Sequence, residues 1–199
     1  LQDWTLPNTI ADWRAAWRKA LDRAETLTAY SPSSKTLIAK TWPDLAGRIE
    51  VRSHRLLQEP APIKAATNQP LTVGVLGNIG YSKGAAIVRD LCSHVSEDFR
   101  VVLIGKIEPA FADNRMIVHG SYDGSEISEL AQRYGVTCWL VPSIWPETFC
   151  FALHECLATG LPVYAFDLGA QSDALKDAQN GRLLALNGPP LTPATFQST

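Results

Sequence analysis

The sequence predicts an α/β protein in which a doubly wound, Rossmann-like parallel sheet of about six strands carries helices on both faces. From Leu71 onward, short apolar runs alternate with loops and amphipathic stretches, a pattern typical of a parallel sheet that is buried on both faces. The 199 residues also suffice for one such domain with a sizeable core but are short for two. We therefore expect a mostly helical remnant of another domain, a linker, the α/β domain and a flexible tail, at residues 1–57, 58–70, 71–187 and 188–199.

The first segment is expected to open with an amphipathic helix. Trp13, Trp17 and Leu21 lie on one helical stripe, with alanines between them. A strand-like run at residues 27–30 and a brief helical stretch that ends near Pro43 follow, and three prolines then mark the linker. Because an apolar stripe needs a partner, we expect it to pack against the α/β domain or a second copy of the chain.

Six strands are expected in the α/β domain, with helices between them. The strands lie at residues 72–76, 100–104, 117–119, 137–141, 162–166 and 182–185. One helix carries Ile87, Val88 and Leu91 on its apolar face. Another opens at Asp123, where Glu126 follows three residues later as in a capping box.

The composition excludes several classes of partner. The net charge of -2, the charged fraction of 19% and the absence of a Lys or Arg run give no electrostatic footprint for nucleic acid or an anionic membrane. No apolar stretch approaches the roughly 20 residues that a membrane span needs. The four cysteines lack Cys-x-x-Cys spacing, and no metal-ligand spacing occurs. We expect a soluble, cytoplasmic chain with reduced thiols and no metal, and the missing initiator Met suggests a fragment.

The first loop of the sheet, Gly77-Asn78-Ile79-Gly80-Tyr81-Ser82-Lys83-Gly84, is a candidate phosphate site. It follows a buried strand and precedes an amphipathic helix, but it matches neither Gly-x-x-x-x-Gly-Lys-Ser/Thr nor Gly-x-Gly-x-x-Gly. Lys83 is expected at a helix N-terminus, where the helix dipole disfavours a cation unless an anion binds there. A bound diphosphate would resolve that conflict. The alternative is a solvated lysine that tolerates the dipole.

The segment from Pro142 to Glu155 is the most informative part of the chain. Its apolar residues form a helical stripe, and Glu155 falls off that stripe. Glu147 precedes the helix, roughly 12 Å from Glu155 if both were helical, which is too far for a tight carboxylate pair. Glu155 would accept hydrogen bonds from a diol such as ribose, Glu147 would address another part of the ligand, and free N–H groups between them would bind phosphate. The alternative is that Glu147 only complements the helix dipole and that Glu155 is a solvated surface glutamate.

These features converge on one edge of the expected sheet. The strand at residues 162–166 is followed by a loop that contains Gly169. Ligands of open α/β sheets bind along the carboxyl edge of the strands. The Lys83 loop, the helix near Glu147 and Glu155, and the Gly169 loop are therefore expected to share one cleft.

At these residues the chain resembles the donor-binding, C-terminal domain of family 4 retaining glycosyltransferases of the GT-B fold. The resemblance rests on the lysine-glycine pair that opens the first helix, on Glu147-Thr148-Phe149 followed by Glu155, and on Gly160-Leu161-Pro162-Val163. It covers residues 71–185 well. It extends more weakly to residues 12–57, which look like the end of the family's acceptor-side domain.

The resemblance implies a role for each candidate residue. Glu147 and Lys83 are the catalytic candidates, with Glu147 on the transferred sugar and Lys83 on the diphosphate. The donor-binding candidates are Gly77, Asn78, Gly80, Lys83, Phe149, Cys150 and Glu155, with backbone at Phe149 and Cys150 on phosphate and Glu155 on ribose. Asn78 stands where many members carry arginine, so one phosphate contact is absent or supplied elsewhere. Most of the acceptor domain is missing, including a histidine near the reacting sugar, and neither His54 nor His119 takes that place.

We therefore expect the donor half of a retaining glycosyltransferase that uses a nucleoside-diphosphate sugar as substrate, with no cofactor. The fragment alone is expected to be inactive, and its acceptor, a glycan or a lipid, is not identified by the sequence. The motif Trp145-Pro146-Glu147-Thr148 resembles that of transferases that build bacterial surface polysaccharide. Two alternatives stay open: a GT-B nucleotide-sugar epimerase, which needs an acid/base pair not found here, and a non-catalytic α/β interaction module.

Overall fold

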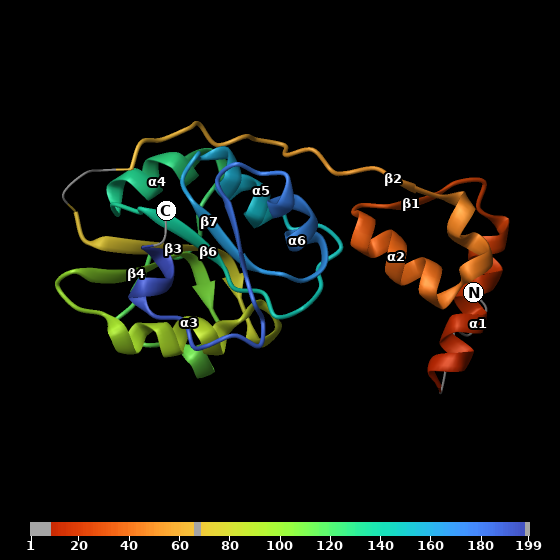
Figure 1. The fold of residues 1–199 in the computed structure, drawn as a ribbon, viewed down its shortest axis with the longest axis horizontal. Helices are drawn as coiled ribbons and strands as arrows, with labels where there is room; N and C mark the ends of the chain where they lie inside the picture. The colour runs from red at the N-terminus through yellow and green to blue at the C-terminus, as the bar shows by residue number, and fades with distance from the viewer. Residues whose placement is uncertain (1–8, 66–68, 198–199) are drawn as a thin grey trace.

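The computed structural model describes residues 9–65 and 69–197. Figure 1 shows a smaller N-terminal part, in red and orange, joined by an extended segment to the α/β domain. The N-terminal part consists of α1 (Ile10–Arg23), β1 (Leu27–Ala29), α2 (Pro32–Thr41), the 3-10 helix η1 (Pro43–Arg48) and β2 (Ile49–Val51). Strands β1 and β2 pair in parallel, and their apolar side chains form a small core with Leu45.

Helix α1 begins as the sequence predicts, but its apolar stripe is not covered within the described chain. Thr9 caps the helix, since its hydroxyl oxygen accepts a hydrogen bond from the N–H of Asp12 at 3.1 Å. Trp13 and Trp17 are 44% and 50% exposed, and no residue of α1 is buried. Only the end of the stripe, at Leu21, reaches the small core. The packing of this stripe against the α/β domain is therefore not seen, and association with a second copy stays a prediction.

The α/β domain contains a parallel sheet of six strands within the described residues, in the order β5-β4-β3-β6-β7-β8. The strands are β3 (Leu71–Ile79), β4 (Phe99–Ile107), β5 (Ile117–Val118), β6 (Cys138–Val141), β7 (Val163–Phe166) and β8 (Gly181–Leu184). The α-helices are α3 (Ala85–Leu91), α4 (Ile127–Arg133), α5 (Phe151–Ala158) and α6 (Gly169–Lys176). Short 3-10 helices lie at η2 (Tyr81–Lys83), η3 (Cys92–His94), η4 (Pro109–Phe111), η5 (Gly124–Glu126) and η6 (Pro193–Phe196). The predicted doubly wound fold and its six strands are confirmed.

Two apolar cores cover the two faces of the sheet, because neighbouring residues of a strand point to opposite sides. Along β6, Cys138 and Leu140 belong to the core that contains α3. Trp139 and Val141 belong to the core that contains α4, α5 and α6. In Figure 1, α3 accordingly lies on the other side of the sheet from α4 and α5.

Strand β3 is longer than the sequence predicts. Gly77 and Asn78, expected in a loop, continue the strand and lie opposite Gly105 and Lys106 of β4. Both glycines have positive φ, of 108° and 141°, and a Cβ on Gly105 would collide with the carbonyl of Gly77. The absence of side chains lets the two backbones stay paired where a bulkier residue would end the strand.

The segments before and after the sheet are fixed to it. In the linker, the N–H of Ile63 donates to the Thr159 carbonyl at 2.8 Å. In the C-terminal segment, which the sequence predicts to be a flexible tail, Phe196 is buried and packs edge-on against Tyr164 at 5.1 Å between ring centroids. Of the helices that the structure describes, none has the length and apolar character to cross a membrane.

Candidate functional site

The candidate site lies at the carboxyl end of β3, where the order of the sheet reverses. Strands β4 and β6 flank β3, so the loops after β3 and β6 lead to helices on opposite faces and leave a crevice between them. Ser82, in the first loop, joins them: its carbonyl accepts hydrogen bonds from the N–H of Ile144 at 3.0 Å and from the Ser143 hydroxyl at 3.4 Å. Gly84 has a φ of +80°, and a Cβ there would collide with the Pro142 carbonyl. The two loops are thus packed backbone to backbone.

Lys83 and Glu147 meet across this junction. Lys83 Nζ lies 3.6 Å from Glu147 Oε1, with side chains that are 49% and 15% exposed. A cavity of about 270 Å³ opens beside the pair. Its lining residues are Ser82, Lys83, Ser143, Trp145, Pro146, Glu147, Thr148 and Phe149. The structure therefore brings the two predicted catalytic residues together, with the cation still accessible to an anionic ligand.

The segment before α5 offers backbone donors rather than a reactive thiol. The helix begins at Phe151, so Phe149 lies before it, and Cys150 is the N-cap residue without a side-chain cap bond. The N-cap residue thus provides no side-chain cap hydrogen bond to the first N–H groups of α5, an arrangement that favours an anion there. Burial, and then the charge of Glu147, raise the pKa of Cys150 to about 12. The thiol is protonated at neutral pH and is not a nucleophile.

Glu155 lines a second cavity, of about 390 Å³, on the β4 side of β3. The lining residues are Asn78, Gly105, Lys106, Ser121, Tyr122, Gly124 and Glu155. Burial raises the pKa of Glu155, and burial together with the Glu155 charge raises the pKa of Tyr122 to about 12. Within the described residues the Glu155 carboxylate has no hydrogen-bond or ion-pair partner. It is a half-buried acceptor on a cavity wall.

The remaining sequence-predicted residues have supporting positions. Gly77 and Gly80 line neither cavity. Gly77 has open space where a Cβ would lie. Gly80 begins the turn into η2, which is held by the N–H of Tyr81 donating to Glu108 at 3.1 Å. His119 bonds to the hydroxyl of Tyr134 at 3.0 Å and lies outside the site.

An aromatic cluster that the sequence did not reveal joins the N-terminal part to the loop that carries Glu147. His54 stacks on Tyr30 at 3.9 Å and meets Phe149 edge-on at 5.2 Å between ring centroids. Phe149 in turn stacks on His154 at 4.4 Å. Burial lowers the pKa of His154, which favours the neutral form of the ring in this cluster. These aromatic residues gave no periodic signal, because they come from three segments that are far apart in the sequence.

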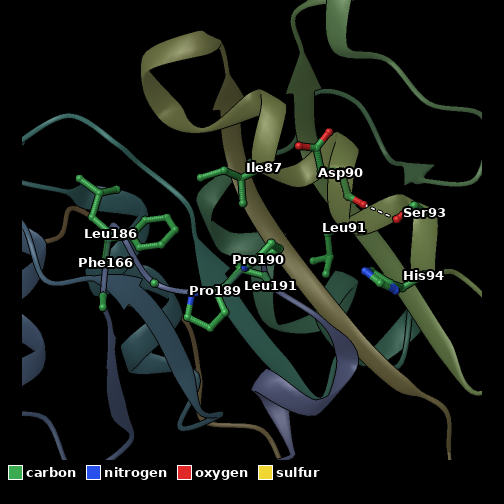
Figure 2. A pocket seen from close by; sticks show the side chains of 12 residues that line it. Ile87, Asp90, Leu91, Ser93, His94, Phe166, Leu186, Pro189, Pro190 and Leu191 are labelled. Atoms are coloured by element: carbon green, nitrogen blue, oxygen red, sulfur yellow. Dashed lines mark hydrogen bonds between the residues drawn. The ribbon is translucent and has the colours of Figure 1, made fainter.

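Another hollow lies away from these residues, between α3 and residues 185–191 (Figure 2). Its walls are mainly apolar, with Ile87 and Leu91 from α3 and prolines from the C-terminal segment. It contains none of the predicted site residues. In the part of the chain that the structure describes, no group of three or more His, Cys, Asp or Glu side chains could hold a metal ion. We therefore assign the candidate site to the carboxyl edge of the sheet.

The sheet order and the crevice at β3 define a Rossmann-like domain of the GT-B type. The family model for glycosyl transferases group 1 matches residues 59–189, which is more than half of the chain. The chain belongs to this family. No curated protein sequence matches it.

Several solved structures share the fold. Anabaena HepE in complex with UDP superposes with a TM-score of 0.70 at 18% identity, over 89% of this chain and 54% of that one. Sucrose-phosphate synthase from Thermosynechococcus elongatus gives 0.66 at 15% identity, over 94% and 52%. The apo lipopolysaccharide outer core galactosyltransferase WaaB gives 0.61 at 18% identity, over 89% and 59%. The chain spans a little more than half the length of these structures, and at these identities the similarity shows the fold alone.

Proposed function

We propose that this domain binds a nucleoside-diphosphate sugar in the two cavities beside β3, as the donor half of a glycosyltransferase that retains the anomeric configuration. The observation that carries the proposal is the Lys83–Glu147 pair, 3.6 Å apart on two different loops at the mouth of the crevice. One cation and one carboxylate at that point match a ligand that carries phosphate beside a hydroxyl-rich ring.

The diphosphate would lie between Lys83 and the start of α5. The lysine side chain is 49% exposed, so it can turn toward a phosphate oxygen while Glu147 turns to the hydroxyls of the sugar. The uncapped N–H groups of α5 supply further donors. Catalysis would then rest on electrostatic stabilisation of the departing diphosphate.

The nucleoside would occupy the cavity that Glu155 lines. Its unpaired carboxylate offers two acceptor oxygens, which suits the two hydroxyls of a ribose. Asn78, which stands where an arginine was expected, lies opposite Lys106 in the sheet, and both residues line this cavity. We infer that Lys106 provides the second positive charge that Asn78 does not.

The wider assignment follows from the resemblance and the fold. HepE has been solved with UDP and with UDP-glucose, so uridine nucleotides are the first ligands to test. Residues 1–57 would be the end of an acceptor-side domain, and the complete enzyme would build a bacterial surface polysaccharide in the cytoplasm. In this proposal the donor reaches from ribose at Glu155 to sugar at Glu147.

The test is a calorimetric titration of the chain with the diphosphates of uridine, guanosine and thymidine. We expect one base to bind clearly more tightly than the others. A non-catalytic interaction module would bind none of them, and that result would refute the proposal. An epimerase would also bind one of the diphosphates. Incubated with the matching nucleotide sugar, however, it would convert that sugar to its epimer, which chromatography detects.

A further inference from the structure

Gln171, on α6, is fully buried, and its amide group bonds to the loop that carries Glu147. Its exposed fraction is 0%. Nε2 donates to the carbonyl of Trp145 at 3.2 Å and to that of Ser143 at 3.4 Å. Oε1 accepts from the N–H of Glu147 at 3.4 Å. One side chain therefore satisfies three backbone groups of a loop that has no regular structure.

The two residues before Gln171 contact the same loop. The N–H of Ala170 donates to the Glu147 carbonyl at 3.0 Å. Gly169 has a φ of +58°, and a Cβ there would lie 2.7 Å from Pro146 Cα. Both backbone groups of Glu147 are thus bonded to the start of α6, and the approach is so close that a glycine is required.

The other side of this loop is held by the loop that carries Lys83. There the Ser82 carbonyl accepts from the N–H of Ile144 at 3.0 Å. The Glu147 loop is therefore fixed between two neighbours, with Lys83 on one side and Gln171 on the other. The separation of the Lys83 and Glu147 side chains depends on both attachments.

We propose that Gln171 is a positioning residue, which holds Glu147 where its carboxylate meets the transferred sugar. This inference rests on the proposed function. An amide is suited to the task because it donates to two carbonyls and accepts from one N–H. A carboxylate of the same size cannot donate, and an apolar side chain can do neither, so in both cases buried backbone groups lose their partner.

The chain offers a matched control in Asn180. Its amide Nδ2 also donates to two backbone carbonyls, those of Leu157 at 3.2 Å and Leu161 at 2.8 Å. Asn180 precedes β8 and Leu161 precedes β7, so this amide lies at the amino edge of the sheet, opposite the site. Asn180→Leu removes the same kind of bonds without reaching the Glu147 loop.

The experiment measures the dissociation constants of UDP and of UDP-glucose by calorimetry, on the full chain. For Gln171→Met and for Gly169→Ala, we expect UDP affinity to stay within about threefold and UDP-glucose affinity to fall about tenfold or more, the scale of one lost hydrogen bond to a charged group. In a Glu147→Gln background, Gln171→Met should change the ratio of the two constants no further. Asn180→Leu should leave that ratio unchanged.

The outcomes separate the positioning role from the proposed function. Equal weakening of UDP and UDP-glucose by Gln171→Met, or an effect that adds to Glu147→Gln, would overturn the positioning role while nucleotide binding stands. If Gln171→Met does not fold, Gln171→Glu, which keeps the size and one acceptor, replaces it. Loss of fold in both, and in Gly169→Ala, would assign these residues to stability alone. If guanosine or thymidine is the base that binds, its diphosphate and the matching nucleotide sugar replace UDP and UDP-glucose in this experiment. A wild-type chain that binds none of the three diphosphates would refute the proposed function and the positioning role with it.

Discussion

Glu155→Gln tests two effects of the unpaired Glu155 carboxylate: the stability that the folded chain loses by holding it half-buried, and the affinity that it contributes to ribonucleotide binding. The variant keeps the shape of the side chain and removes its charge. Glu155 lines the cavity beside β3 without a partner among the described residues, and burial raises its pKa. A half-buried acceptor without a donor is held at a cost, which a ligand with hydroxyl groups can relieve.

The structure gives the direction of both effects. A carboxylate that accepts from two ribose hydroxyls becomes an amide with one acceptor oxygen, so about one charge-assisted bond is lost, or about 1.5–3 kcal/mol. Ribonucleotide affinity should therefore fall about 10- to 150-fold, and the 2′-deoxy form should lose less because it already lacks one donor. Without ligand, Glu155→Gln should melt at the same or a higher temperature at neutral pH, since the charged form is the one that burial disfavours.

The sign of the pH dependence follows from the raised pKa of Glu155 in the folded chain. The carboxyl group contributes its full stability below its unfolded pKa, where it is protonated in both states, and this contribution is lost as the pH rises through the higher folded pKa. The difference in melting temperature between wild type and Glu155→Gln should consequently disappear in acid and grow toward neutral pH. Differential scanning calorimetry across that range measures it.

The assay pairs these melts with calorimetric titrations of UDP and 2′-deoxy-UDP. Glu97→Gln is the matched control, because Glu97 is exposed and precedes β4 at the opposite edge of the sheet. It should alter neither affinity nor the pH dependence. If folded Glu155→Gln binds the ribonucleotide as tightly as wild type does, Glu155 is a solvated glutamate and the assignment of this cavity to the nucleoside is wrong.

Three further predictions concern the phosphate contact, the loop packing and the N-terminal helix. Lys83→Ala should weaken nucleoside diphosphate binding by about 1.5–3 kcal/mol and nucleoside binding far less, as measured by calorimetry. The control is Lys176→Ala, at the exposed end of α6. Equal weakening of both ligands by Lys83→Ala would indicate a disturbed fold. Gly84→Ala should destabilise the chain by about 2 kcal/mol or more in urea unfolding, because the residue has a φ of +80° against a neighbouring carbonyl; an unchanged midpoint would contradict the backbone packing. Serine at both Trp13 and Trp17 should abolish self-association in light scattering, whereas a strictly monomeric wild type with solvent-exposed tryptophan fluorescence would rule out the association.

The helical start at Asp123 was predictable because local side chains form it. The capping box at Asp123 is present, with the Asp123 N–H donating to Glu126 at 2.7 Å. Strand β2 was not predicted, since three residues carry too little periodicity and its pairing with β1 joins residues about 20 positions apart in sequence. The extension of β3 through Gly77 was missed for a related reason: glycine favours a loop locally, and only the neighbouring Gly105 permits the strand to continue.

In the candidate site, too, some features follow from the sequence and others only from the tertiary structure. Parallel strands place all their carboxyl ends on one edge, so the sequence alone determined that the Lys83 loop and the Glu147 loop share a cleft. Only the tertiary structure decided that their side chains lie 3.6 Å apart, that Glu155 is half-buried without a partner, and that Gln171 bonds to the Glu147 loop. The periodicity of a sequence indicates which face of a helix or strand is apolar. The burial and hydrogen bonding of a polar residue depend instead on loops and helices that are distant in sequence, and these contacts form only when the sheet assembles.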